Sequence, residues 1–274
     1  MRSNYLSRIT TMILQLKKIL TKRFSHFQDY VIIAHRGASG YTPENTFAAF
    51  DKAIELGADY LELDVQLAKD EEVVVIHDAK VDRTSNGKGH IHHFTLKELQ
   101  KLEAGSWFHE DFYGERIPTL TQVLQRYGGK IGMLIEVKYP SLYPTIAEKL
   151  AKLLTEEMYH NQTIIVQSFD FQFLKQFHQH APSIPLGLLV KYSIKGITNN
   201  QLKEWSSLVS YINPNKALVT KTLVKKIHYR NMKTFPYTAR DRKGMEKLIH
   251  NRVDGIITDF PDLTKKDPSI ESSP

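Results

Sequence analysis

The sequence contains no cysteine among its 274 residues. Disulfide bridges and thiolate metal sites are therefore excluded, and the absence fits a reducing compartment. Long apolar runs are also missing: the run at 9–16 contains two threonines and a glutamine, and it is far too short to span a bilayer. No Ala-x-Ala-like cleavage site follows it. We therefore expect neither a transmembrane helix nor a signal peptide. We expect a cytoplasmic protein whose membrane contact, if any, is peripheral.

Net charge is nearly absent from most of the chain. Residues 1–30 contain six Lys or Arg and one Asp, whereas the other 244 residues contain 31 basic and 29 acidic side chains, a net charge of +2. A body this close to neutral argues against a nucleic-acid groove. We therefore expect no nucleic-acid partner. The sequence leaves the oligomeric state open.

The length and the order of the elements favour a single α/β barrel. With 274 residues and 41% apolar content, one barrel of ~250 residues would use nearly the whole chain. From Tyr30 onward, strand-like and helix-like runs alternate, which is typical of a parallel sheet with helices outside. The sequence predicts a (β/α)8 TIM barrel over residues 30–264. Its eight expected strands are 31–34, 59–67, 132–137, 163–167, 186–190, 210–212, 234–237 and 255–258.

Helices are expected between these strands. The first of them has clear start and stop signals. Thr42 is placed to cap a helix with Pro43 at its first position and Gly57 as its stop. The other expected helices cover 120–126, 145–158, 171–178, 201–209, 217–229 and 243–251. The apolar run Val73–Ile76 follows too short a turn for a crossover helix. It is either an irregular barrel strand or an antiparallel excursion.

Three segments fall outside the repeating pattern. Residues 78–118 are rich in turns, with one short helix begun by the capping-box residues Thr95 and Glu98, and we expect them to form an insertion that walls the active-site face. Residues 265–274 are expected to be a disordered tail. Residues 1–29 predict an extra N-terminal amphipathic helix with a basic face. Residues 1–28 either contact an anionic membrane surface or dock on the bottom of the barrel.

Two carboxylates on the second strand predict a metal site. Side chains two apart on a strand share a face, so Glu62 and Asp64 lie about 6.6 Å apart along one wall. Leu61, Leu63 and Val65 form the opposite, apolar face, which needs a helix layer. The carboxylates then face the barrel axis, where they repel each other unless a cation lies between them. Oxygen ligands suit one hard divalent cation, Mg²⁺ or Ca²⁺.

Further charged side chains stand at the ends of other strands. Glu136 and Lys138 alternate in the same way on the strand 132–137, and His35, Arg36 and His77 follow apolar runs, where an α/β barrel collects its catalytic groups. Three carboxylates and one divalent ion leave a local charge of about −1, which Arg36 and Lys138 reverse. Because guanidinium and ammonium groups bind phosphate oxygens, this arrangement predicts a metal-dependent phosphodiesterase.

An ordered series of short motifs supports this interpretation. The chain resembles the glycerophosphodiester phosphodiesterase family in eight segments: His35-Arg36-Gly37, Pro43-Glu44-Asn45-Thr46, Glu62-Leu63-Asp64-Val65, His77-Asp78, Asp82-Arg83-Thr84, Asn86-Gly87-Lys88-Gly89, Glu136-Val137-Lys138 and Thr258-Asp259. The resemblance implies a (β/α)8 barrel with an insertion, and hydrolysis of a small-molecule glycerophosphodiester to glycerol 3-phosphate and an alcohol. It differs at Glu71, where a turn glycine is common, and at Pro236-Tyr237-Thr238, where a tryptophan-containing segment is usual.

The same resemblance assigns roles to individual residues. Glu62, Asp64 and Glu136 match the metal ligands, His35 and His77 match the acid–base pair, and Arg36 and Lys138 match the residues that contact the substrate phosphate. In such a substrate, the glycerol hydroxyl next to the ester oxygen can act as the nucleophile, through a cyclic phosphate. His35 as base and His77 as acid is our working assignment.

The sequence leaves two other functions open. A lysophospholipase D or a phosphoinositide-type phospholipase C, acting on membrane lipids, would use the same barrel, and a non-catalytic barrel would only bind phosphodiesters. His90, His92 and His93 suggest a zinc site, but they lie in a turn-rich segment without clear further ligands. We expect them to be solvated loop residues.

Overall fold

The computed structural model describes residues 30–156, 159 and 162–264. The predicted N-terminal helix and the predicted tail 265–274 lie outside these residues. No described helix is long and apolar enough to cross a lipid bilayer.

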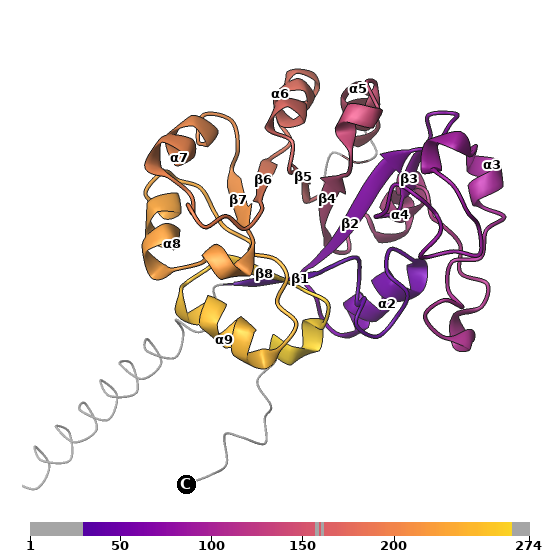
Figure 1. Cartoon of the computed structure of the whole chain (residues 1–274), viewed down its shortest axis with the longest axis horizontal. Helices are drawn as coiled ribbons and strands as arrows, with labels where there is room; N and C mark the ends of the chain where they lie inside the picture. The colour runs from indigo at the N-terminus through magenta and orange to yellow at the C-terminus, as the bar shows by residue number, and fades with distance from the viewer. Residues whose placement is uncertain (1–29, 157–158, 160–161, 265–274) are drawn as a thin grey trace, which may run out of the picture. The chain divides into compact units, whose positions relative to one another are not determined.

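Seven parallel strands form the main sheet (Figure 1). They are β1 (Val31–Ala34), β2 (Tyr60–Leu67), β4 (Gly132–Val137), β5 (Ile164–Ser168), β6 (Leu186–Val190), β7 (Tyr211–Pro214) and β8 (Gly255–Thr258), in the order β7-β6-β5-β4-β2-β1-β8. Because every neighbouring pair is parallel, the carboxyl ends of all seven strands meet at one face. Seven of the eight expected strands are confirmed to within one or two residues at either end.

The segment 233–239 occupies the eighth barrel position. It makes isolated parallel bridges to β7 at Tyr211–Lys233 and Asn215–Tyr237, and to β8 at Ala239–Thr258. The predicted strand 234–237 therefore lies at the expected position between β7 and β8, but it is joined to them by isolated bridges rather than by a regular ladder of hydrogen bonds. Pro236 has no N–H to donate, which interrupts a ladder, although its carbonyl accepts a hydrogen bond from Ile257. With this segment the barrel closes, and the predicted TIM-barrel fold is confirmed.

The run after β2 is an antiparallel excursion. β3 (Val73–Val75) pairs with the end of β2 in the register Val65–Val75 and Leu67–Val73. Glu71, in the connecting turn, has φ = 63°, a left-handed conformation that glycine adopts at no steric cost.

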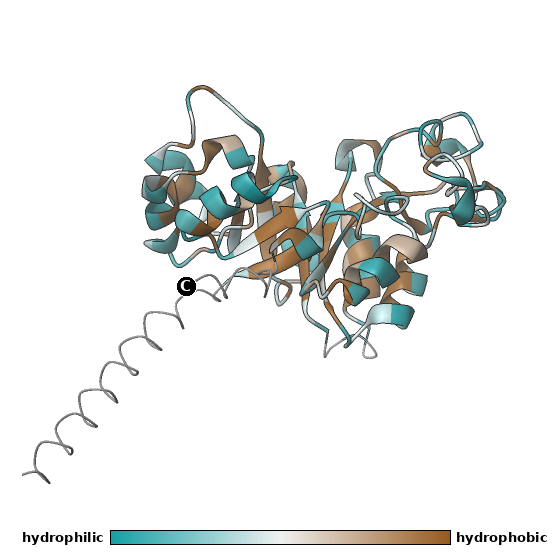
Figure 2. Ribbon diagram, turned by 90° about the horizontal axis from the view of Figure 1, so that it is seen from below, coloured by the Kyte–Doolittle hydropathy of each residue, from teal (hydrophilic) through white to brown (hydrophobic). Residues whose placement is uncertain are grey.

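Helices cover the outside of the strands (Figure 1). They are α2 (Phe47–Glu55), α4 (Leu120–Tyr127), α5 (Ile146–Leu154), α6 (Phe171–His180), α7 (Asn199–Trp205), α8 (Lys221–His228) and α9 (Arg242–His250). Figure 2 shows apolar residues concentrated on the strands and polar residues on the outer helix surfaces. Between β3 and α4 the chain forms 3₁₀ turns and one short helix, α3 (Leu96–Leu99), whose predicted capping box, Thr95 with Glu98, is confirmed.

The predicted start of the first helix was wrong. α2 begins after Thr46, whose side chain accepts a hydrogen bond from the N–H of Ala49, whereas the residues from Thr42 to Thr46 form turns. Asn45 has φ = 59°, which ends any helical path through this segment. Its side-chain amide donates to Asp64 instead. A residue of the site thus overrides the local capping signal.

We expect Phe50→Ala to lower the free energy of unfolding by roughly 3–5 kcal/mol, because a fully buried ring would leave a cavity. Phe50 lies on the inner face of α2 with no exposed surface and packs edge-on against Tyr127. Urea denaturation measures the change. Ile54→Ala on the exposed side of the same helix is the matched control. Equal losses in the two variants would contradict this view of the core.

Candidate active site

Three carboxylates from two neighbouring strands meet inside the barrel. Glu62 and Asp64 lie on β2 and Glu136 on β4, and the pairing of the strands places Asp64 level with Glu136. One oxygen from each of the three residues lies within 4.8 Å of the others. Their exposed fractions are 1%, 1% and 6%. Across residues 30–156, 159 and 162–264, no other group of three such side chains is close enough to share an ion.

Burial and mutual repulsion perturb these acids. Burial, together with the charges of Asp64 and Glu136, holds the pKa of Glu62 well above its usual value. Burial and the charge of Asp64 raise the pKa of Glu136 to about 7. Burial alone would also raise the pKa of Asp64, but the adjacent Arg36 and Lys138 outweigh it and lower that pKa. The cluster therefore has to hold protons unless more positive charge is supplied.

The donor set fits a hard divalent cation. All the potential ligand atoms are carboxylate oxygens, which Mg²⁺ and Ca²⁺ prefer. Oδ1 of Asp64 is buried without a hydrogen-bond partner, and Nζ of Lys138 lies 3.8 Å from it. An unpaired buried carboxylate oxygen is costly, and a bound ion would satisfy it. Glu62, Asp64 and Glu136 thus form a candidate metal site.

Two cationic side chains border the carboxylates. The backbone N–H of Arg36 donates to Oε2 of Glu62 (2.9 Å). The side-chain Nε of Arg36 lies 3.3 Å from Oδ2 of Asp64. Lys138 donates from Nζ to Oε1 of Glu136 (2.6 Å). Arg36 has φ = 57° and Gly37 has φ = 80°. A Cβ at Gly37 would lie 2.6 Å from the backbone of Ala49, so the tight turn that presents Arg36 requires glycine at this position.

Each predicted histidine is held by an aspartate that is itself held by an arginine. Nδ1 of His35 lies 2.6 Å from Asp259, whose other oxygen accepts a hydrogen bond from Arg240. When Nδ1 of a histidine donates to an aspartate, its Nε2 is left free to take up or release a proton. Although burial opposes it, the bond from His35 and the contact with Arg240 lower the pKa of Asp259 to about 2. The aspartate therefore remains ionised as an acceptor for His35.

His77 has the same arrangement. Its Nδ1 lies 2.6 Å from Asp78, which accepts hydrogen bonds from Arg83. These bonds from Arg83 hold the pKa of Asp78 far below its usual value. Asp78 therefore remains ionised beside Nδ1 of His77. Burial lowers the pKa of His77.

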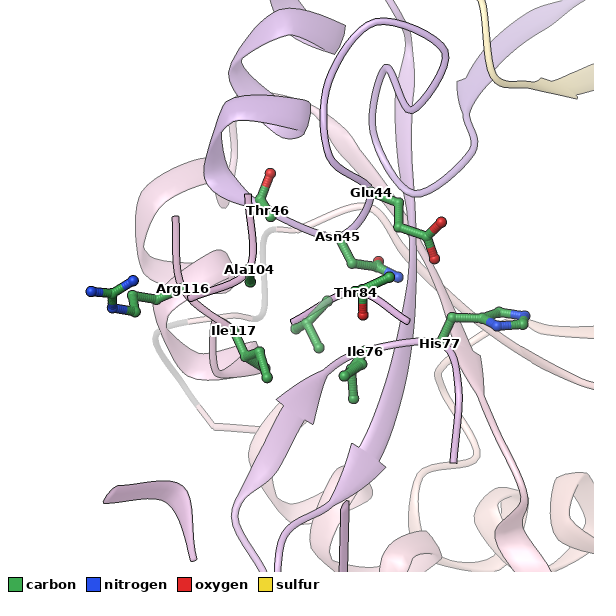
Figure 3. Close-up of a pocket in the computed structure, with 10 residues that line it drawn as sticks. Glu44, Asn45, Thr46, Ile76, His77, Thr84, Ala104, Arg116 and Ile117 are labelled. Atoms are coloured by element: carbon green, nitrogen blue, oxygen red, sulfur yellow. The ribbon is translucent and has the colours of Figure 1, made fainter. Parts of the chain in front are cut away.

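A salt-bridge network links His77 to Arg36. Glu44 accepts hydrogen bonds from both Arg36 and Arg83, and Arg83 continues to Asp78 and His77. Figure 3 shows Glu44 and His77 pointing to the same side of a small cavity, with Arg116 pointing away on the other side. A rigid network of this kind fixes the relative positions of Arg36 and His77.

An aromatic wall lies beside Lys138. The ring of Phe169, after β5, has Nζ of Lys138 5.8 Å from its centroid and packs edge-on against Tyr237. The hydroxyl of Tyr237 donates to the carbonyl of Val190. The segment that replaces the usual tryptophan therefore still supplies an aromatic ring to this wall.

The structure brings together the residues expected to hold metal and phosphate, and it adds partners that the sequence did not reveal. The added residues are Glu44, Asn45, Asp78, Arg83, Gln167, Phe169 and Asp259. Several belong to the quoted motifs, which gave no role to them. His90, His92 and His93 have ring centroids 4.4–5.6 Å apart, but they are not among the groups placed to share an ion.

Comparisons with known proteins agree with this geometry. Residues 35–263 match the model of the glycerophosphoryl diester phosphodiesterase family. The chain is 46% identical to the Bacillus subtilis protein YhdW, over 88% of this chain and 99% of that protein. It is 42% identical to a glycerophosphodiester phosphodiesterase of Caldanaerobacter subterraneus, over 85% of this chain and 95% of that protein.

Solved structures show the same relationship. A phosphodiesterase from Oleispira antarctica, in complex with the product sn-glycerol-3-phosphate, superposes with a TM-score of 0.79 at 28% identity, covering 88% of this chain and 97% of that one. The glycerophosphodiester phosphodiesterase of Agrobacterium tumefaciens gives a TM-score of 0.73 at 30% identity, covering 86% of this chain and 98% of that one. The family model spans most of the chain, and so the chain belongs to the glycerophosphoryl diester phosphodiesterase family of hydrolases.

Proposed function

We propose that the chain hydrolyses glycerophosphodiesters to glycerol 3-phosphate and an alcohol, and that it requires one divalent cation, Mg²⁺ or Ca²⁺. The observation that carries the proposal is the buried cluster of Glu62, Asp64 and Glu136 beside two cationic side chains. The Oleispira phosphodiesterase, which shares the fold, binds sn-glycerol-3-phosphate as its product.

Charge balance supports a phosphate site at Arg36 and Lys138. With its three carboxylates ionised, the cluster and these two cations have a net charge of −1, which would repel an anionic diester. A divalent ion held by Glu62, Asp64 and Glu136 changes this charge to +1. The guanidinium then offers paired donors to the phosphate oxygens, and the ammonium group of Lys138 offers a compact charge.

The two histidines act as the acid–base pair. In a glycerophosphodiester the glycerol hydroxyl adjacent to the ester oxygen attacks phosphorus, so that no nucleophile from the chain is needed. One histidine takes the proton of that hydroxyl at Nε2, and the other protonates the departing alcohol. When water opens the cyclic phosphate, the two exchange roles. Asp259 and Asp78 hold the Nδ1 protons of His35 and His77 throughout.

The bound cation would supply Lewis-acid stabilisation of negative charge on the non-bridging phosphate oxygens. The chain's own residues supply the remainder. Arg36, anchored by Glu44, binds an oxygen of the same phosphate, and the wall of Phe169 and Tyr237 borders the space beside Lys138. We further propose that residues 78–118 form a wall of the substrate pocket. Thr84, Ala104 and Ile117 of this segment line the small cavity beside His77, which supports this proposal.

The direct test measures glycerol 3-phosphate released from glycerophosphocholine by the purified full chain. We expect release with added Mg²⁺ or Ca²⁺ and none after chelation. A panel of soluble glycerophosphodiesters and lysophospholipid vesicles identifies the preferred alcohol. Absence of product from every diester with every cation would reject the proposed function, whereas a strong preference for lysophospholipid would favour a lysophospholipase D.

We expect Arg83→Gln to lower kcat about tenfold with a smaller change in KM. Arg83 does not face the cluster itself, but it holds Asp78 and Glu44 in place, so its loss loosens His77 rather than removing a phosphate contact. Steady-state kinetics measures the change. Arg116→Gln is the matched control, because the guanidinium of Arg116 bonds only a neighbouring carbonyl among the contacts described. Equal effects in both variants would contradict a positioning role.

A further inference from the structure

Exposed apolar side chains gather on the face of the barrel that holds the site. Two loops contribute most of them: the loop 138–144 after β4, with Tyr139 and Leu142, and the loop 191–198 after β6, with Tyr192 and Ile194. Their exposed fractions are 42%, 50%, 59% and 94%. Soluble proteins usually avoid such concentrations of exposed apolar surface, and where they occur they mark protein or membrane contacts.

The two loops are neighbours. β4, β5 and β6 are adjacent parallel strands, so their carboxyl ends lie side by side. The ring of Phe169, which follows β5, has Nζ of Lys138 5.8 Å and Nζ of Lys191 5.1 Å from its centroid. The two lysines therefore lie within about 11 Å of each other, and the loops that begin with them lie on the same face of the barrel.

The charge of these loops is of one sign. Neither 138–144 nor 191–198 contains an Asp or a Glu, whereas the second loop carries Lys191 and Lys195 on either side of Tyr192 and Ile194. Tyrosine, aliphatic side chains and lysine together are the composition of membrane-interface segments, since the apolar parts enter the acyl region while the ammonium groups stay among the headgroups. Lysines near an anionic surface add electrostatic attraction.

We propose that these two loops dock the active-site face on an anionic phospholipid surface. The docking patch consists of six residues: Tyr139, Leu142, Tyr192 and Ile194, with Lys191 and Lys195. A protein partner is less well matched, because the apolar residues stand on two separate loops, with lysines and no acidic residue between them, rather than on one packed face. The patch places the opening of the site against the headgroup layer, where diesters released from lipids are produced.

Other exposed aromatic residues do not share this environment. Tyr41 is hydrogen-bonded to Asp262 and packs on Phe260. Tyr113 follows Glu110 and Asp111, whose charges would be repelled by anionic lipid. Tyr229, 86% exposed, lies at the end of α8, which leads back to the opposite face of the barrel. It is therefore a matched control for an exposed side chain away from the patch.

The absence of cysteine allows a local test in the full chain. Ile194→Cys and Tyr229→Cys each give one labelling site for an environment-sensitive NBD fluorophore. On addition of phosphatidylcholine/phosphatidylglycerol vesicles we expect a blue shift and at least a doubling of intensity at position 194, and neither at position 229. Pure phosphatidylcholine should give a weaker response. No change at 194, or equal changes at both positions, would overturn the proposal.

A second measurement tests the contribution of the patch to binding. We expect the double variant Tyr192→Asp/Ile194→Asp to co-sediment with the anionic vesicles about tenfold less than the unsubstituted chain, and to hydrolyse soluble glycerophosphocholine within twofold of it. Unchanged co-sedimentation would show that another segment binds the membrane and would reject the patch. A blue shift that appears on raising the protein concentration without vesicles would identify a second copy as the occupant and would also reject it. Because neither readout needs catalysis, failure of the proposed function is detected separately.

Discussion

His77→Ala is expected to lower kcat on glycerophosphocholine by roughly 10²–10⁴-fold, the range lost with a positioned acid or base. His77 is held by Asp78, and its partner His35 is held by Asp259 in the same manner, so His35→Ala is expected to lose activity over a similar range. The measurement is the initial rate of glycerol 3-phosphate release at saturating cation. Circular dichroism and the melting temperature should remain close to those of the unsubstituted chain, because both rings border the site rather than the apolar core.

The leaving group separates the two roles. p-Nitrophenol departs as an anion and needs no proton, so the acid becomes dispensable with a p-nitrophenyl ester of glycerol phosphate. Under the working assignment, His77→Ala should release p-nitrophenol in the first turnover within about tenfold of the rate of the unsubstituted chain, while His35→Ala should stay slow on both substrates. The comparison is made on the first turnover because opening of the cyclic phosphate needs His77 as the base. If His35→Ala recovered activity on this ester instead, His35 would be the acid and His77 the base.

A control variant and an opposing result complete this test. His109→Ala changes an exposed histidine whose contact, Asp111, is also exposed, and it should leave both activities unchanged. If either His35→Ala or His77→Ala retained more than a third of kcat on glycerophosphocholine, that histidine would have no part in proton transfer.

The candidate metal site was largely predictable because it depends on short-range periodicity. Glu62 and Asp64 share a face through the two-residue repeat of a strand, whatever the rest of the fold does. Glu136 follows the same pattern on β4, and strand pairing then sets it level with Asp64. Once the strand order is that of a barrel, the three acids have to converge. Local alternation and topology therefore determined the metal site together.

The partners of the histidines could not be predicted in this way. His35 bonds Asp259, 224 residues later in the chain, and only the pairing of β1 with β8 brings them together. The start of α2 was mispredicted for a related reason. Thr42 and Pro43 form a good local start signal, but Asn45 is needed in a left-handed conformation to reach Asp64. Long-range contacts within the site therefore determine both the partners of the histidines and the start of α2.

Removal of the divalent cation is expected to abolish hydrolysis, and the strength of cation binding should depend on pH through the buried acids. The pKa of Glu136 is raised to about 7, and that of Glu62 is raised well above its usual value, mainly by burial. A cation binds the ionised carboxylates, so it must displace these protons below pH 7. We expect the Kd for Mg²⁺ or Ca²⁺ to increase as the pH falls from 8 to 6. Isothermal titration calorimetry in buffers of different ionisation enthalpy should show more proton release from Glu136 at pH 6 than at pH 8.

The sign of the stability change follows from the same pKa values. Because the pKa of Glu136 in the folded state lies above its ordinary value of 4.5, the folded state binds more protons than the unfolded state between these two pKa values. The metal-free chain therefore loses stability as the pH rises from about 4.5 to about 7. A bound cation replaces the protons, so the increase in melting temperature on adding metal should be larger at pH 7.5 than at pH 5.5.

The variant Glu136→Gln tests whether Glu136 itself couples cation binding to proton release. The amide keeps the shape of the side chain but removes its charge and its proton, so cation affinity should fall by roughly 100-fold or more, and proton release should decrease. The metal-free variant should be at least as stable as the unsubstituted chain at pH 7.5, because it no longer buries this charge. Glu55→Gln, on the exposed end of α2, should change none of these quantities. If Glu136→Gln bound the cation with unchanged affinity, the ion would lie elsewhere. The three acids would then have to be explained by their contacts with Asn45, Arg36 and Lys138 alone.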